Sequence, residues 1–344
     1  MNKLCDEGLM LSEHTGLLAV YGIKTLVCFL GLFLLVYVYI YQNPTKSFHI
    51  NSQIIFQFHC CFVVAGIVGT SLSDGFDLMR FTVVKAIRAA NPQFEDCLVP
   101  PMSPYVGVAL KSIKVFGNNG VVYTTTALAI ERIVSSLQLE SYEQKNSILG
   151  WTLSAISLMA SGVLVAIRVG LADYSKDLSI TSFTAAATGF SMRLQYSCAA
   201  VEVLTAFLLF VLLGLNIRRL KRRERIVNSL AYKAQIRENV SATALAFPLA
   251  FLHFVVYLPT GVVMPTWALS KTDLSERMQA VAMSDFMPLY FAFFPLVLWW
   301  RNRAKKVNIA NLFVNNLIRT GDTKGEKDGL ETAKYFEILN KMLK

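Results

Sequence analysis

The chain contains 344 residues, of which 54% are hydrophobic and 16% are charged, and its formal net charge is +10. Its mean hydropathy of +0.46 is unusual for a soluble globular protein and indicates an integral membrane protein. The positive charge does not indicate binding to nucleic acid, because the basic residues flank apolar stretches and no aromatic-basic RNA-binding motif occurs. We expect these residues to face anionic lipid of the inner membrane leaflet instead.

A helix needs about 20 mostly apolar residues to cross the hydrocarbon core of a bilayer, and it satisfies its backbone hydrogen bonds internally. Seven stretches meet this demand. The sequence therefore predicts an all-α fold, an integral membrane bundle of seven transmembrane helices over residues 19–300. The predicted spans are Ala19–Tyr41, Ile50–Ser73, Pro104–Val134, Ile148–Val169, Tyr196–Asn216, Val240–Val263 and Gln279–Trp300.

The distribution of Lys and Arg predicts the orientation of the bundle. Most of the basic residues outside the spans lie between Arg218 and Arg237 or after Trp300, and such residues accumulate on the cytoplasmic side. We therefore expect an extracellular N-terminus of residues 1–18 and a cytoplasmic tail of residues 301–344. The first residues lack the pattern of a cleavable signal peptide.

The tail begins with Arg303, Lys305 and Lys306, followed by apolar residues at three- and four-residue spacings. This pattern predicts an amphipathic helix at about residues 303–319 on the inner membrane face. The alternative is a basic stretch that only solvates the end of the seventh helix.

Polar side chains inside the spans indicate a pocket in the outer half of the bundle. A charge at mid-bilayer costs roughly 2.5–3.5 kcal/mol on insertion scales and usually marks a ligand site, a pathway or an ion pair. The third span is the least apolar, and its charges lie at a depth similar to that of acids on the fifth and seventh spans. Two interpretations stay open: a structural pair of Lys114 with Glu202 or Asp285, and a ligand site. The predicted ligand-binding residues are Lys111, Lys114, Asn118, Glu202, Asp285 and Tyr290.

Prolines predict bends in the last two spans. Pro248 and Pro259 flank His253 in the sixth span, and Pro288 and Pro295 lie in the seventh. Each proline removes a backbone hydrogen bond and bends its helix. Such helices suit a bundle that opens on one side when a ligand binds on the other, although transporters also contain kinked helices.

At the cytoplasmic end of the third span, Glu131 and Arg132 form a charged pair where the apolar run stops. This run and two others resemble landmarks of the nematode serpentine chemoreceptors of the Sra superfamily, with the epsilon (Sre) class closest and the alpha-beta and alpha classes next. The matching motifs are Ala127-x-x-Ile130-Glu131-Arg132-Ile133 followed by Tyr142-Glu143, Phe48-His49-x-Asn51, and Leu230-Ala231-x-Lys233-Ala234-Gln235-Ile236-x-Glu238-Asn239.

The resemblance implies a G protein-coupled receptor in the plasma membrane of a sensory neuron or its cilium, which detects a small environmental molecule and activates a heterotrimeric G protein. The chain departs from rhodopsin-like receptors at Ile133, where those carry tyrosine, and at Met287-Pro288-Leu289-Tyr290, where those carry Asn-Pro-x-x-Tyr. The coupling residues implied by the resemblance are Glu131, Arg132, Tyr142, Glu143, Gln235, Glu238 and Asn239.

The six cysteines do not form a metal-binding pattern. Cys97 precedes the third span, where many seven-helix receptors anchor a disulfide to the loop after the fourth helix. The loop Gly170–Gln195 has no cysteine here. We favour a bridge from Cys97 to Cys198, while Cys5 as the partner and free thiols stay open because spacing does not fix connectivity.

Two other classes of protein compete with the receptor interpretation. Gly69-Thr70-Ser71-Leu72 matches a loose serine-protease motif with His253 as a conceivable base, but no metalloprotease or phosphate-binding motif accompanies it, so we expect neither catalysis nor a cofactor. A ligand-gated channel or transporter is the stronger alternative, since charged residues within seven helices also line ion paths.

Overall fold

The computed structural model describes residues 2–42, 48–91, 93, 96–138, 142, 146–175, 177–181, 188–223, 230–271, 274–301 and 303. The chain divides into two compact units, Met1–Trp299 and Trp300–Lys344. The predicted amphipathic helix at 303–319 lies almost entirely outside the described residues. The first unit contains the helix bundle.

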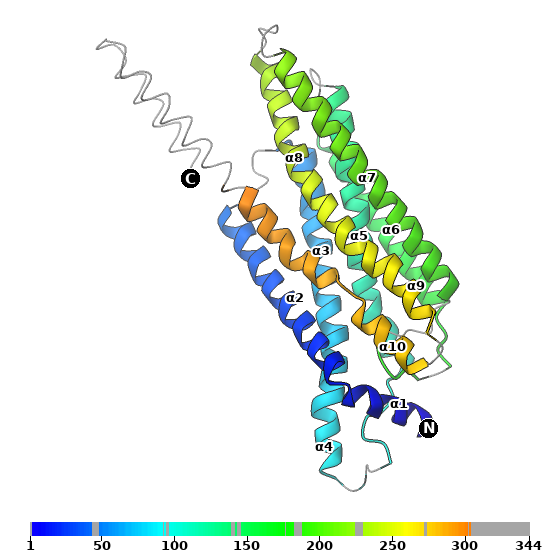
Figure 1. Ribbon diagram of the computed structural model, residues 1–344. Helices are drawn as coiled ribbons and strands as arrows, with labels where there is room; N and C mark the ends of the chain where they lie inside the picture. Colours follow the sequence, from blue (N-terminus) through cyan, green and yellow to red (C-terminus); the bar gives the residue numbers. More distant parts are fainter. Residues whose placement is uncertain are drawn as a thin grey trace, which may run out of the picture. The chain divides into compact units, whose positions relative to one another are not determined.

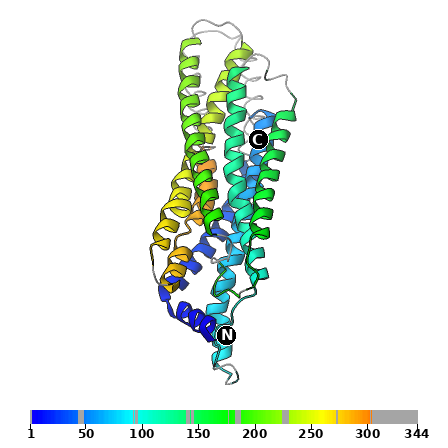
Figure 2. The ribbon, with the colours of Figure 1, turned by 90° about the vertical axis from the view of Figure 1, so that its right-hand side faces the viewer.

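Long helices running alongside one another make up this unit (Figures 1 and 2). The first six predicted spans each correspond to one of them. Shorter helices cover the end of the bundle at which α1 lies. We call this the α1 end, and we call the opposite end, where Arg132 lies, the Arg132 end. The helices are α1 (Asn2–Glu13), α2 (Thr15–Gln42), α3 (Ile50–Met79), α4 (Lys85–Ala89), α5 (Pro104–Leu137), α6 (Ile148–Gly170), α7 (Thr188–Arg223), α8 (Leu230–Leu258), α9 (Met264–Leu269), α10 (Leu274–Met283) and a last helix over 287–301.

Within the described residues, five helical stretches are long and apolar enough to cross a membrane. The helix α5 is not among them, as its lysines and amides led us to expect. The last helix is described only over 287–301, which is too short for this criterion. The five stretches are Thr15–Gln42, Ile50–Ala89, Ile148–Gly170, Met192–Lys221 and Gln235–Ala268.

The predicted seventh span, Gln279–Trp300, is wrong as a single helix. α10 ends at Met283, and the last helix begins after a break at residues 284–286. Pro288 suits this start, because proline is tolerated in the first turn of a helix, where its missing N–H needs no intrahelical partner. Asp285 Oδ1 accepts a hydrogen bond from the Met287 backbone N–H at 3.1 Å, which satisfies one exposed donor of the new helix.

The prolines of α8 have different effects. Pro248 lies inside the regular helix, whereas Pro259 begins a π-helical turn over Pro259–Val263. A π turn widens the helix by one residue and is often found at functional sites. The predicted sixth span thus ends with an irregular turn at its α1 end.

Glycines let α3 and α5 approach unusually closely. A Cβ atom placed on Gly117 would lie less than 3.0 Å from backbone atoms of Gly66, and one on Gly69 would lie less than 3.0 Å from backbone atoms of Lys114. Small residues at a helix crossing allow such backbone contact, which is a main source of helix association in membranes. Both helices therefore lose their close contact if these positions gain side chains.

The α1 end is closed by segments that pack on α3. Leu11 of α1 joins an apolar cluster with Tyr21, Phe81, Val99 and Ile180. The segment after α6 pairs with the segment before α5 through reciprocal backbone hydrogen bonds between Met102 and Leu178, at 2.8 and 2.9 Å.

Side-chain bonds from α3 hold the same segment in place. Asp77 Oδ2 accepts hydrogen bonds from the Thr181 backbone N–H at 2.8 Å and hydroxyl at 2.5 Å. Arg80 donates to Asp77 at 3.1 Å, to the Ser179 carbonyl at 3.3 Å and to the Pro100 carbonyl at 2.6 Å. A buried ion pair therefore anchors the segment after α6, which carries no cysteine.

The favoured disulfide Cys97–Cys198 is wrong. Cys97 is bonded to Cys5 of α1, and Cys198 is a buried free thiol on α7 that lies against the hydroxyls of Tyr257 and Tyr123. Cysteine spacing alone could not choose among the possible partners. The bridge ties α1 to the segment that leads into α5.

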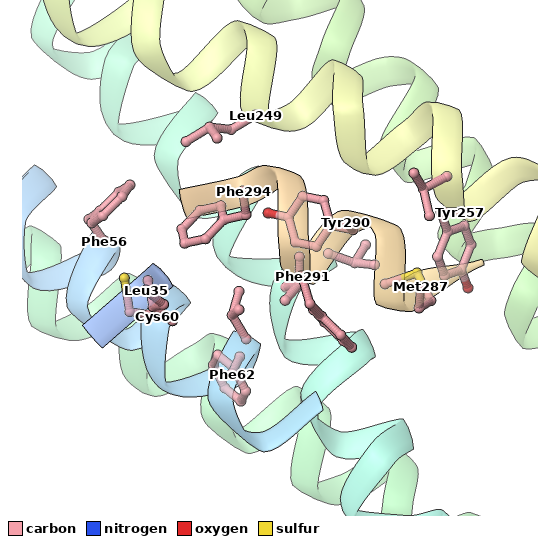
Figure 3. Close-up of a cluster of buried hydrophobic side chains, with 14 of the residues drawn as sticks. Leu35, Phe56, Cys60, Phe62, Leu249, Tyr257, Met287, Tyr290, Phe291 and Phe294 are labelled. Carbon is pink, nitrogen blue, oxygen red and sulfur yellow. The ribbon is translucent and has the colours of Figure 1, made fainter. Parts of the chain in front are cut away.

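The apolar core runs along the inner faces of the bundle and is rich in aromatic side chains. Figure 3 shows Tyr290, Phe291 and Phe294 of the last helix directed towards α3, α5 and α8. Phe294 stacks on Phe56 of α3 at a ring separation of 6.0 Å. The last helix is therefore held mainly by aromatic packing, which is worth about 0.5–1.5 kcal/mol per ring pair beyond area burial.

We predict that Gly117→Ala destabilises the protein by about 1–3 kcal/mol, because the added methyl overpacks a backbone contact. The measurement is the midpoint of thermal unfolding in detergent. Gly162→Ala is the matched control, since a Cβ at Gly162 has no atom within 4 Å. Equal stability of the two variants would contradict the close crossing.

We also predict that Cys5→Ser and Cys97→Ser each lower stability by about 2–4 kcal/mol, while Cys198→Ser leaves the bridge in place. Mass spectrometry of unreduced peptides should find a Cys5–Cys97 crosslink in the unmodified chain and in Cys198→Ser. A crosslink that includes Cys198 would refute the pairing.

Candidate ligand and coupling sites

A buried cluster of alternating charges connects α2, α3, α5 and the break before the last helix. Lys114 of α5 forms ion pairs with Asp285 and with Asp74 of α3, the latter at 3.8 Å. Asp74 also pairs with Lys24 of α2 at 3.6 Å. Two lysines and two aspartates balance in charge, as burial within a membrane bundle requires.

The position of Lys114 depends on the glycine crossing. The α3 backbone at Gly69 lies against the α5 backbone at Lys114, so the lysine reaches along α3 to Asp74. Of the two partners considered for Lys114, the structure thus selects Asp285. Glu202 lies in a different cluster.

Lys111 and Asn118 flank this charge cluster on α5. Lys111 lies one turn towards Pro104 and is partly buried. Asn118, one turn in the other direction, is also partly buried, and its Oδ1 makes no hydrogen bond within the described residues. The hydroxyls of Thr25 and Thr70 are likewise buried without hydrogen-bond partners in this part of the chain. The region therefore has polar capacity that the described residues do not satisfy.

A second polar cluster lies among α3, α5, α7, α8 and the last helix. His59 of α3 bonds Thr124 Oγ1 through Nδ1 and the Tyr290 hydroxyl through Nε2, both at 2.8 Å. Glu202 of α7 faces His253 of α8, with 2.9 Å between Oε1 and Nδ1. The Tyr290 and His253 rings meet edge to face, with centroids 4.6 Å apart. Tyr290 therefore bridges the two histidines.

The two polar clusters are linked through the irregular turns. The Phe286 backbone N–H donates to Thr260 Oγ1 at 3.0 Å, which joins the break before the last helix to the π turn of α8. Asp285 of the first cluster and Tyr290 of the second lie on the same stretch of chain, at the break and in the first turn of the last helix. The break before the last helix and the π turn of α8 are thus joined by a hydrogen bond between Phe286 and Thr260.

Sequence reasoning missed Lys24, Asp74 and His59. Lys24 is a charge inside the first apolar stretch and His59 a polar residue inside the second, which is a signal of the kind used for Lys114. Asp74 lies one residue beyond the predicted end of the second span, so the search for charges inside the spans did not include it. The described residues contain no group of three or more side chains suited to hold a metal ion.

At the Arg132 end, a latch of hydrogen bonds encloses Arg132, whose exposed fraction is 1%. Its Nε donates to Glu131 Oε2 at 2.5 Å, and its Nη2 donates to Glu131 and to Ser52 Oγ of α3 at 2.5 Å. Its Nη1 donates to Asn239 Oδ1 of α8 at 3.3 Å. In this arrangement the guanidinium of Arg132 is not accessible to a partner protein.

Tyr142 completes the latch from the segment after α5. Its hydroxyl donates to Glu131 and accepts from Asn51 Nδ2 at 3.2 Å, and its ring packs on His49 at 4.4 Å. Burial and the nearby Glu131 carboxylate raise the pKa of the Tyr142 hydroxyl, so it remains a donor at neutral pH. Glu143 lies outside the described residues.

The predicted coupling residues of α8 tie that helix to the same latch. Asn239 accepts from Ser135 Oγ at 2.6 Å and donates to its carbonyl at 3.2 Å. Gln235 approaches the same hydroxyl at 3.5 Å, and Glu238 accepts from the His49 backbone N–H at 2.5 Å. Six of the seven predicted coupling residues therefore meet at one place.

Comparison with known proteins identifies the family of the chain. Residues 2–344 match the model of the serpentine type 7TM GPCR receptor class ab chemoreceptors. The chain belongs to this family. It is a chemosensory receptor of the seven-transmembrane G protein-coupled type, which is a receptor family and not an enzyme family.

A curated relative of the receptor supports the same assignment. Serpentine receptor class beta-17 of Caenorhabditis elegans is 22% identical over 306 residues, which cover 86% of this chain and 80% of the relative. The matching family model is class ab, whereas the sequence motifs had placed the epsilon class first.

We predict that Lys114→Met and Asp285→Asn each lower the thermal stability of the receptor, because each leaves one buried charge unmatched, at a cost of about 3–5 kcal/mol. The double variant should recover most of the loss, since Lys24 and Asp74 then balance each other. Asparagine can still accept the Met287 N–H bond. Losses that simply add in the double variant would show that the two residues do not pair.

Proposed function

We propose that the receptor has its N-terminus outside the cell, binds a small environmental molecule in the half of the bundle nearer to the α1 end, and activates a heterotrimeric G protein at the Arg132 end. Its membrane would be the plasma membrane of a sensory neuron or its cilium. The basic end of α7, with Arg218, Arg219 and Lys221, would then face anionic lipid of the inner leaflet.

The observation that carries this proposal is the position of α8. This helix contributes His253 to the second polar cluster and Asn239 to the latch around Arg132. The two residues are 14 positions apart, or about 21 Å along a helix. A ligand that shifts α8 near His253 therefore acts on the hydrogen bonds of Asn239.

Release of Arg132 is the expected consequence. Asn239 Oδ1 accepts from both Arg132 and Ser135, so a movement of α8 breaks both bonds together. Ligand-driven switching requires a contact that is either made or broken, and the Asn239 hydrogen bonds at the Arg132 end would be such a contact.

Breaking the latch directly tests the coupling role without a known ligand. We predict that Glu131→Gln raises basal G protein activation about tenfold, because the charged hydrogen bonds to Arg132 contribute about 1.5–3 kcal/mol to the closed state. The measurement is nucleotide exchange on a panel of Gα subunits in membranes that contain the receptor.

Adding Arg132→Leu to Glu131→Gln should return exchange to background while surface expression persists, because no buried charge is left unmatched at that site. Glu276→Gln, which alters an exposed carboxylate, serves as the matched control. Elevated exchange in the double variant would remove Arg132 from the coupling mechanism.

Orientation is tested in intact cells with one epitope tag at the N-terminus and another between residues 218 and 237. We predict that antibody reaches the first tag before permeabilisation and the second only afterwards. The reverse result would place the Arg132 end outside and favour a channel or transporter.

A further inference from the structure

The buried carboxylates of the described residues differ in their counterions. They are Asp74, Asp77, Glu131 and Glu202. The first three pair with lysine or arginine. Glu202 alone faces a histidine, and an imidazole carries positive charge only when it is protonated. Glu202 is thus the buried acid without a permanent counterion.

The geometry around Glu202 is also incomplete. Its side chain is 2% exposed and that of His253 is fully buried. Beyond the 2.9 Å contact between Glu202 Oε1 and His253 Nδ1, these two atoms and His253 Nε2 have no hydrogen-bond partner among the described residues. Buried polar atoms in native proteins normally have partners, so a ligand that donates hydrogen bonds would complete this site.

An ammonium group fits what this place offers. It supplies a positive charge and several N–H donors to the Glu202 carboxylate. The rings of Tyr290 and Tyr257 lie beside His253, with centroid separations of 4.6 and 5.6 Å. Aromatic faces attract cations, most strongly where water is excluded. The combination of acid and tyrosines favours an amine over a neutral alcohol of the same shape.

The helix next to the site has the means to admit a ligand. The π-helical turn Pro259–Val263 begins two residues after Tyr257, and such turns are frequent at functional sites. An ammonium bound to Glu202 also replaces the contact with His253, which releases α8 at this level.

We infer that Glu202, with His253 and the flanking tyrosines, is the recognition site for a small organic amine, bound as its ammonium ion. This inference rests on the proposed function and names the ligand class. The charge cluster around Lys114 then has a structural role and holds the helices beside the amine site in place.

The test compares amines with neutral alcohols of the same shape on the purified full-length receptor. Pentylamine, cyclohexylamine and benzylamine are titrated against pentanol, cyclohexanol and benzyl alcohol, and binding is measured as the shift in thermal unfolding. At least one amine is expected to bind at least tenfold more tightly than its alcohol. This comparison needs no variant, so it does not depend on how a substitution folds.

Glu202→Gln should weaken that amine at least tenfold and leave the alcohols unchanged, whereas Glu276→Gln should change neither. Equal affinity for amine and alcohol, full amine affinity in Glu202→Gln, or no response to any of the three amines would each overturn the inference. The proposed function is tested separately by nucleotide exchange: it fails if Glu131→Gln does not raise exchange. The amine-binding assay contains no G protein, so its outcome is independent of that result.

Discussion

A charge buried among membrane helices is stabilised by an opposite charge, and ion pairs of this kind recur along the bundle of this receptor. Lys24, Asp74, Lys114 and Asp285 join three helices to the break before the last one. Asp77 with Arg80 closes the α1 end, and Glu131 with Arg132 closes the other. The first group joins different helices and so helps to fix which of them are neighbours, because an unmatched buried charge costs about 3–5 kcal/mol. The other two pairs each lie within one stretch of chain.

The pairs depend in turn on close backbone contact. Gly66, Gly69 and Gly117 bring α3 and α5 together, and without that approach Lys114 would not reach Asp74. Aromatic packing then holds the last helix against both. The polar and apolar parts of the bundle are therefore parts of one arrangement, in which small residues set the distance that charged residues span.

Much of this fold could be predicted from the sequence, because hydropathy over some 20 residues reflects the thickness of a bilayer. Six spans and the polar character of the third follow from it. The break at 284–286 could not be found this way, since both of its flanks are apolar. The Cys5–Cys97 bridge was missed because connectivity depends on where α1 folds back, which no local pattern encodes. The motifs correctly predicted that the coupling residues lie together. The contact between Glu202 and His253 could not be predicted, because it depends on how α7 and α8 are rotated about their axes.

The glycine crossing bears on how the helices can move. With their backbones in contact, α3 and α5 have little freedom to slide or rotate against each other, so we expect them to move together as one frame. α8 and the last helix carry the π turn and the break, and they pack on that frame through side chains. Superposing ligand-bound and ligand-free structures on α3 and α5 alone would therefore show any motion as a displacement of α8 and the last helix. Substitutions that bond α8 to α3 or α5 are a route to holding the receptor in a single state for crystallisation.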